Sequence, residues 1–233
     1  MIERLLPWAV VGFVIVFLGI GLFALRVWEP NDEVDHLEAW NLSQAEQTFL
    51  LLLARRQLEA VLDGGSPIVI DCSEFPENLV QHAACFVSLY KGETLRGCMI
   101  DAFVPHEPLV QNVLRNAVLA ATGDERFPPV EAGELEHVRI EISVLGPLQE
   151  VSFDSADELL AKLSPGVDGV VLTTSTGQSA FLPWVWERFP DPEQFLAQLC
   201  KKQGAPADCW QTMPLPGVEL FPVTYFSEAD PEP

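Results

Sequence analysis

An uncharged apolar run near the N-terminus constrains this chain more than any other feature. Residues 5–25 form a stretch of 21 residues without a charged side chain, with Arg4 before it and Arg26 after it. As a helix rising about 1.5 Å per residue, the run would extend ~31 Å, which matches the hydrocarbon core of a bilayer. It predicts an uncleaved single-pass membrane anchor over residues 1–28.

Two other structures compete with the anchor: a cleaved signal peptide and a buried core helix. A signal peptide has a shorter apolar region that ends in small residues at a cleavage site. This run instead leads into Arg26 and Val27. Trp8 and Trp28 lie near the two expected interfaces, where aromatic side chains are enriched, so the anchor is favoured. The orientation stays open, because one flanking basic residue, Arg4, balances Arg26.

The remainder of the chain is strongly acidic. The whole sequence has 13 basic and 34 acidic residues, a net charge of −21 and a pI near 4.3, yet its mean hydropathy is +0.19. The anchor explains this combination, because residues 29–233 keep 11 of the basic and 33 of the acidic side chains. Such a charge repels phosphate backbones and anionic headgroups. We expect no nucleic-acid partner and a domain that stands off the lipid surface.

Composition and capping signals divide the rest of the chain. Residues 29–42 are predicted to be an acidic linker, residues 43–228 a folded domain and residues 229–233 a tail. Helix starts are predicted at Ser43 and Ser155, which open capping boxes, at Pro108, and at Asp191, which Pro192 follows. Strands are predicted at residues 68–70, 83–90, 94–100, 138–145, 167–174 and 220–226. Because helices and strands mix without βαβ alternation, the fold class is predicted to be α+β.

The two β-prone runs that flank Gly92 predict a hairpin. In the second strand, a side-chain period of two places Arg96 and Cys98 on one face. A guanidinium beside a thiol favours the nucleophilic thiolate, so Cys98 and Arg96 form a candidate catalytic pair. Gly97 between them lets another backbone or a ligand approach closely. The alternative is that Cys98 is an inert apolar side chain in the core.

Four further side chains are candidates for a site. Glu141 lies in an apolar run and would act as an acid or base only where it faces a polar site rather than bulk solvent. Arg126 either binds an anion or pairs with Asp124 or Glu141 to fix a loop. Trp184 and Trp186 form either a binding platform or part of the core.

Metal and nucleotide sites have no support in the sequence. The five cysteines include no C-x-x-C, and the four histidines form no H-x-x-x-H pair. Phosphate-loop and G-x-S-x-G motifs are absent. We therefore expect no metal and no cofactor. The odd cysteine count favours reduced thiols, whereas in an oxidising space one pair could bridge and one thiol must be left over.

Several short motifs, taken together and in order, resemble one known family. They are residues 95–100 (LRGCMI), 124–129 (DERFPP), 141–145 (EISVL), 168–169 (DG), 181–185 (FLPWV) and 195–200 (FLAQLC). The resemblance is to the AMMECR family, named for the Alport syndrome, midface hypoplasia and elliptocytosis chromosomal region. Its prokaryotic members are called AmmeMemoRadiSam system protein A. The resemblance covers residues 42–227.

This resemblance implies an α+β fold with a larger and a smaller subdomain and a cleft near the strand of Cys98. It also implies two partners, a Memo-like protein similar to non-haem iron dioxygenases and a radical S-adenosylmethionine enzyme. It implies no particular reaction. The motif residues that we take as ligand-binding candidates are Gly97, Asp124, Arg126, Phe127, Pro183 and Trp184.

The chain departs from the family pattern at two positions and in its anchor. Ile100 stands where the family usually has Gly, and Trp184 stands where Gln is usual. We expect a membrane-tethered binding or adaptor module that works with the two implied partners. The alternative is a cysteine-dependent enzyme. The partners favour a domain on the cytoplasmic side, although a short N-terminal tail suits an external domain equally well.

Overall fold

The computed structural model describes residues 39–230. The predicted anchor and most of the predicted linker lie outside these residues. Within residues 39–230, no helix has both the length and the apolar character needed to cross a bilayer. Leu42 is buried, and Trp40 donates a hydrogen bond from Nε1 to the Leu145 carbonyl at 2.8 Å. The stretch predicted to be a linker therefore joins the folded domain before residue 43.

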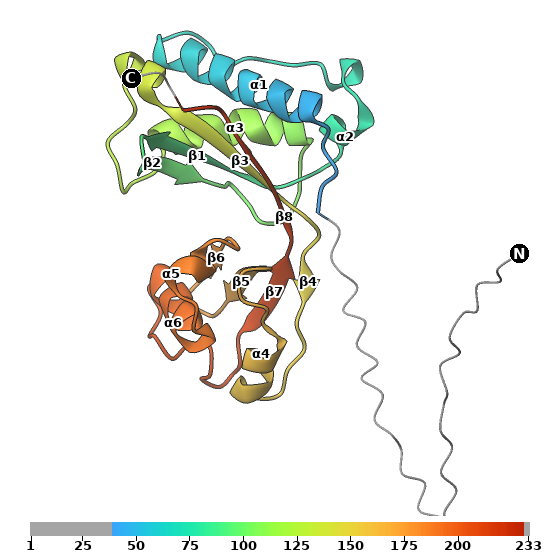
Figure 1. Cartoon of the computed structure of the whole chain (residues 1–233), viewed down its shortest axis with the longest axis vertical. Coiled ribbons are helices and arrows are strands. Elements are labelled where there is room, and N and C mark those ends of the chain that lie inside the picture. The colour runs from blue at the N-terminus through green and yellow to red at the C-terminus, as the bar shows by residue number, and fades with distance from the viewer. Residues whose placement is uncertain (1–38, 231–233) are drawn as a thin grey trace, which may run out of the picture. The chain divides into compact units, whose positions relative to one another are not determined.

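A four-stranded antiparallel sheet in the order β2-β1-β3-β8 organises a larger lobe. Helices α1 (Gln44–Leu62) and α3 (Leu109–Thr122) cover one of its faces (Figure 1). The strands are β1 (Cys85–Lys91), β2 (Thr94–Met99), β3 (Arg139–Leu145) and β8 (Val223–Ser227). Three short helices complete this lobe: η1 (Cys72–Glu74), α2 (Glu77–Val80) and η2 (Ala132–His137).

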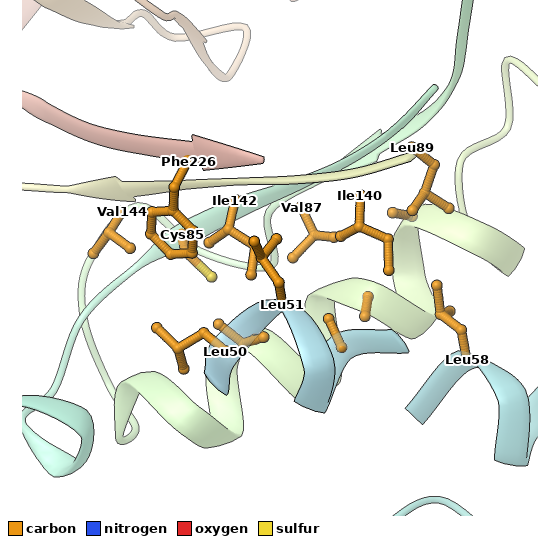
Figure 2. Packing of buried hydrophobic residues seen from close by; sticks show 14 of the residues in the cluster. Leu50, Leu51, Leu58, Cys85, Val87, Leu89, Ile140, Ile142, Val144 and Phe226 are labelled. Atoms are coloured by element: carbon orange, nitrogen blue, oxygen red, sulfur yellow. The ribbon is translucent and has the colours of Figure 1, made fainter. Parts of the chain in front are cut away.

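The core of the larger lobe lies between the helices and this sheet. Alternate residues of each strand point toward the helices, as the period of two requires. Figure 2 shows the result, in which leucines of α1 meet aliphatic side chains of β1 and β3. Burial of this apolar surface is the main stabilising contribution to the lobe. The labelled side chains are Leu50, Leu51, Leu58, Cys85, Val87, Leu89, Ile140, Ile142, Val144 and Phe226.

The predicted helix starts are confirmed. At the start of α1, the Ser43 hydroxyl accepts from the Glu46 N–H at 3.3 Å, and the Glu46 carboxylate accepts from the Ser43 N–H at 2.8 Å. At Ser155 only half of the predicted capping box forms. The Ser155 hydroxyl accepts from the Glu158 N–H, but the Glu158 carboxylate accepts from the N–H of Asp154.

A second four-stranded sheet, in the order β4-β7-β5-β6, organises a smaller lobe. Its core contains Trp186 stacked on Phe195, with ring centroids 3.6 Å apart. The strands are β4 (Gln149–Glu150), β5 (Gly169–Thr173), β6 (Gln178–Phe181) and β7 (Gly217–Phe221). The helices are α4 (Ala156–Lys162), α5 (Val185–Arg188) and α6 (Pro192–Lys202). The mixed architecture confirms the predicted fold class.

The chain crosses between the lobes twice, and the two crossing segments lie side by side. The Gly146 N–H donates to the Pro222 carbonyl at 2.8 Å, where β3 leads toward β4 and β7 leads into β8. We call residues 39–146 and 222–230 the large lobe and residues 147–221 the small lobe. The single strand predicted over residues 220–226 is wrong, because Pro222 divides it between the two sheets. The strand predicted over residues 68–70 does not form, and Val69 there is 94% exposed.

Cysteine pairing differs from the expectation of reduced thiols. Cys200 of α6 forms a disulfide with Cys209 inside the small lobe. Cys72, Cys85 and Cys98 are free. The expectation for an oxidising space was one bridged pair with one thiol left over. The structure has the bridged pair, but three thiols are free.

Candidate functional site

The helix-free face of the large sheet meets the small lobe. Its contact is an apolar cluster in which Phe86 and Ile100 of the large lobe pack with Val171 and Leu182 of the small lobe. Cys98 and Trp184, the motif residues from the two lobes, lie at the margin of this cluster. The fold therefore brings motifs separated by more than eighty residues in sequence to one junction.

Polar side chains replace apolar ones along one row of this face. The pairing register places Cys98, Ser88, Glu141 and Ser227 side by side on the four strands. Ser88 and Glu141 are buried, and the Ser88 hydroxyl lies 3.2 Å from the Cys98 sulfur. Buried polar side chains must find partners, so such a row is costly in a sheet that serves packing alone. We take this row of side chains as the large-lobe part of the candidate site.

The predicted pairing of Arg96 with Cys98 is wrong. The register slips at Leu89, so that Arg96 has no partner on β1 and forms a β-bulge. A bulge redirects its side chain and breaks the period of two on which the prediction depended. The Arg96 guanidinium instead donates to Glu134 at 2.8 Å and to the Pro128 and Pro129 carbonyls at 2.7 and 3.0 Å.

The Cys98 thiol is not activated. Burial raises its pKa, and this effect outweighs the opposing contribution of the Ser88 hydroxyl and the nearby cationic groups of Lys202 and Arg126. A neutral thiol is a weak nucleophile, because the reactive form is the thiolate. The geometry therefore supports the alternative interpretation of Cys98 as a small, partly buried side chain of the junction.

Asp124 and Arg126 form side-chain hydrogen bonds to the backbone at the outer edge of β2. Asp124 accepts the Cys98 N–H at 2.9 Å, while Arg126 donates to the Cys98 carbonyl at 3.3 Å. Two further bonds, at 2.8 and 2.7 Å, join the Arg126 guanidinium to the Asp124 carboxylate. That pairing holds the pKa of Asp124 below its usual range. Side chains thus satisfy backbone groups of an edge strand that would otherwise attract another strand.

Glu141 is tied into a second cluster on the same face. Its Oε2 accepts from Arg139 at 2.6 Å and from the Tyr225 hydroxyl at 2.8 Å. The Tyr225 ring meets Trp184 edge to face, with centroids 5.5 Å apart. Trp184 thus contacts the large lobe, whereas Trp186 is buried in the small lobe, so the two tryptophans do not form a shared platform.

The remaining three predicted ligand-binding residues serve local structure. Phe127 lies under the Arg126 guanidinium, which is 5.4 Å from the ring centroid. The Pro183 carbonyl accepts the Trp186 N–H at 3.2 Å in the turn that begins α5. Gly97 permits the close approach of a backbone rather than of a ligand, because a Cβ there would lie 2.0 Å from the Ala120 carbonyl oxygen of α3.

Lys202, at the end of α6, is a member of the site that the sequence did not reveal. Its ammonium donates to the Ala180 carbonyl at 2.8 Å and lies 5.2 Å from the centroid of the Phe181 ring. Lys202 as a whole is exposed to solvent. Its ammonium group is partly desolvated by the surrounding protein, and this lowers the pKa of Lys202. Cys98 and Arg126 are among its electrostatic neighbours. A lysine in the last turn of a helix ordinarily offsets the helix dipole, so nothing in the local sequence distinguished it.

Two hollows and one cluster of acidic and histidine side chains lie outside the junction. The two hollows lie in the large lobe, one beside Phe49 and Phe75 and one beside Arg55, and both are lined by residues other than those of the junction. Asp101, His106 and Glu107 place potential metal ligands within 4.8 Å of one another. Arg115 already supplies a cation there, at 2.8 Å from Glu107 and 3.6 Å from Asp101.

Archaeal proteins are similar to this chain in sequence and in fold. The AMMECR1 family model matches residues 51–223. A protein of Methanothermobacter thermautotrophicus is 34% identical over 174 residues, which cover 72% of this chain and 88% of the relative. A protein of Thermococcus onnurineus is 37% identical over 172 residues, covering 70% and 80%. The crystal structure of an uncharacterized protein from Pyrococcus horikoshii matches with a TM-score of 0.71 at 33% identity, covering 78% of this chain and 91% of that one.

Proposed function

This chain belongs to the AMMECR1 family, and from that membership we propose that it is a binding module rather than an enzyme. In this proposal, residues 5–25 tether the domain to a membrane. The domain presents its junction to a Memo-like protein and a radical S-adenosylmethionine enzyme. One observation carries the choice of a module: the motif side chains at Cys98 hold one another and the backbone, and the thiol is kept neutral.

Fixed side chains suit binding because a surface that is already ordered loses little conformational entropy when a partner arrives. Tyr225 illustrates this point. Its side chain is 48% exposed, yet Glu141 holds its hydroxyl and Trp184 packs against its ring. An exposed aromatic ring held in one position is typical of a residue that anchors a partner protein.

The partners can be tested with the full chain in a mild detergent. We expect a tagged chain to retain both a Memo-like protein and a radical S-adenosylmethionine enzyme from the same organism. Tyr225→Ala should weaken retention about tenfold or more, as loss of an aromatic anchor does. Leu52→Ala is the matched control, because Leu52 is 56% exposed on α1, which covers the opposite face of the large sheet. Recovery of neither partner, or equal retention by both variants, would contradict the proposal.

The alternative function, a cysteine-dependent enzyme, makes an opposite prediction about Cys98. Because burial raises the pKa of this thiol, we expect iodoacetamide to modify it at pH 7 at least about tenfold more slowly in the native chain than in urea. Peptide mapping after timed quenching measures the rate. Cys85, which is fully buried, provides a protected reference, and partly exposed Cys72 provides an accessible one. If Cys98 reacts faster than Cys72, the enzyme becomes the better proposal.

The side of the membrane is proposed from the partners alone. A Memo-like protein and a radical S-adenosylmethionine enzyme place the domain on the cytoplasmic side. The Cys200–Cys209 disulfide favours an oxidising compartment instead. The binding proposal itself depends on neither orientation, since the junction is formed entirely by the folded domain.

A further inference from the structure

The two sheets end in four edge strands, β2, β8, β4 and β6, and most of these edges are protected. An open edge presents unpaired N–H and C=O groups that can pair with another strand, so native proteins shorten or cover such edges. Strand β4 has only two residues. At the edge of β2, Asp124 accepts the Cys98 N–H and Arg126 donates to the Cys98 carbonyl. Both of these edges are therefore poor templates for a further strand.

Lys202 protects the edge of β6. In the turn between β5 and β6, Thr174 and Gly177 exchange two backbone hydrogen bonds. Because the bonds of an antiparallel ladder alternate from residue to residue, the Ala180 carbonyl points away from β5. The Lys202 ammonium donates to this outward carbonyl at 2.8 Å. Three of the four edges are thus short or covered by side chains.

Strand β8 has no such protection within residues 39–230. It pairs with β3 on one side alone. The Glu228 N–H donates to a β3 carbonyl at 3.0 Å, and the Pro222 carbonyl accepts an N–H just beyond β3 at 2.8 Å. Even-numbered residues of β8 therefore turn their backbone groups toward β3, and odd-numbered residues turn theirs outward. Among the described residues, no hydrogen bond reaches the outward groups, which belong to Val223, Tyr225 and Ser227.

The Tyr225 side chain stands beside this open edge. It lies on the helix-free face of the large sheet, where its hydroxyl donates to Glu141 at 2.8 Å and its ring meets Trp184. A strand added to β8 would place every second side chain on the same face. Apolar side chains at those positions would cover the exposed part of the ring.

Charge indicates what kind of segment the edge accepts. Residues 223–230 contain two acidic side chains and no basic one, and Asp230 is 74% exposed. The chain as a whole has a net charge of −21. A basic segment is attracted to such a surface, whereas a second copy of the chain is repelled.

We propose that the free edge of β8 binds an extended basic segment of a partner protein, which adds a fifth, antiparallel strand to the large sheet. The outward groups of Val223, Tyr225 and Ser227 form the new ladder. Main-chain hydrogen bonds of this kind provide affinity, and the side chains on either face provide specificity. Docking by strand addition rests on the proposed function, because it is the way in which the binding module would hold its partner.

The chain's own residues 29–38 are a competing occupant of the edge. They precede Trp40, whose carbonyl accepts from the Thr224 hydroxyl at 2.7 Å, so they start close to β8. However, residues 29–38 contain five acidic side chains and no Lys or Arg. Their charge disfavours pairing with an acidic edge, as the charge of a second copy does.

The test follows amide hydrogen exchange by NMR in the full chain in mild detergent. The probe is a seven-residue peptide that alternates lysine and valine. In the free chain, we expect the Tyr225 and Ser227 amides to exchange at least about tenfold faster than those of Thr224 and Phe226, which bond to β3. Saturating peptide should slow the outward amides at least about tenfold and leave the inward ones unchanged.

Ser227→Pro and Ser227→Ala form a matched pair of variants. Both lose the hydroxyl, but only proline removes the outward N–H, and an edge strand tolerates proline where its N–H faces solvent. We expect Ser227→Pro to bind the peptide at least about fivefold more weakly than Ser227→Ala, as the loss of one hydrogen bond does.

Modified peptides test the same bonds without altering the chain. In an antiparallel pair, residues directly opposite each other share a face, so the valines lie opposite the outward residues of β8. N-methylation of the valine amides should weaken binding to the unchanged chain at least about fivefold, whereas N-methylation of the lysine amides should change it by less than about twofold. A peptide with glutamate in place of lysine should also bind at least about fivefold more weakly.

The opposite results would overturn strand docking on β8. They are unchanged exchange of the outward amides with peptide, equal binding of the two N-methylated peptides, and equal binding of the acidic peptide. Outward amides that are already protected in the free chain would also overturn it. Such protection indicates a second copy if it grows with protein concentration, and residues 29–38 if it does not. The peptide replaces the natural partners, so failure of strand docking and failure to recover those partners are distinguishable.

Discussion

Replacing Gly97 by alanine is expected to lower the free energy of unfolding by about 3 kcal/mol or more. The added Cβ would lie 2.0 Å from the Ala120 carbonyl oxygen and 3.0 Å from its carbonyl carbon. Both atoms belong to the backbone of α3, so no side-chain rotation relieves the overlap. Helix α3 would have to move off the sheet and open the core of the large lobe. Urea unfolding of the full chain in mild detergent, followed by circular dichroism, measures the loss.

Gly133 is the matched control for this substitution. No atom lies within 4 Å of a Cβ built at Gly133, and its φ is not in the left-handed region. Gly133→Ala should therefore change the free energy of unfolding by no more than about 0.5 kcal/mol. If Gly97→Ala is equally mild, the close packing of β2 on α3 is wrong, and the glycine in the LRGC motif needs a different explanation.

Asp124→Ala is expected to lower the free energy of unfolding by about 2 to 4 kcal/mol. The substitution removes a carboxylate that accepts hydrogen bonds from several other groups. The Cys98 N–H loses its acceptor, and the Arg126 guanidinium loses both bonds to the carboxylate. The edge of β2 would be left with unpaired backbone groups. Unfolding of the variant in urea measures the cost, and faster hydrogen exchange at β2 locates it.

The neighbouring acid provides the control, and acid pH provides a second check. Glu125 is exposed, so Glu125→Ala should change the free energy of unfolding by no more than about 0.5 kcal/mol. Because the pKa of Asp124 is lowered in the folded state, its stabilising charge is present above its unfolded pKa and is lost as pH falls through the folded value. The difference in the free energy of unfolding between Asp124→Ala and the unchanged chain should therefore become smaller below about pH 4. A difference that stays constant to lower pH would contradict the pairing.

Local signals in the sequence were enough to locate the four longest helices, α1, α3, α4 and α6, but not the short helices α2 and α5. Ser43 with Glu46, and Asp191 with Pro192, begin α1 and α6 where capping rules place them, because capping depends only on residues a few positions apart. Pro222 shows the limit for strands. A proline in a strand interior marks an interruption, but nothing nearby indicates that the two halves join different sheets.

The site was harder to predict than the fold because its geometry depends on pairing over long distances. Cys98, Asp124 and Arg126 were identified from their motifs, and the structure brings them together. Arg96 was assigned the wrong neighbour, since a β-bulge depends on how β2 aligns with β1 and leaves no trace in β2 alone. Lys202 was missed because its contacts with the Ala180 carbonyl and the Phe181 ring depend on how α6 packs on β6.

The connection between the lobes has a consequence for how such chains diversify. Leu145 at the end of β3 pairs directly with Val223 at the start of β8, so these strands form a β-hairpin whose loop is the entire small lobe. A host hairpin tolerates exchange of an insert whose two ends lie side by side, because its own register is untouched. Cys98 belongs to the host and Trp184 to the insert. A new insert would therefore leave the Cys98 framework intact and replace only the small-lobe side of the junction.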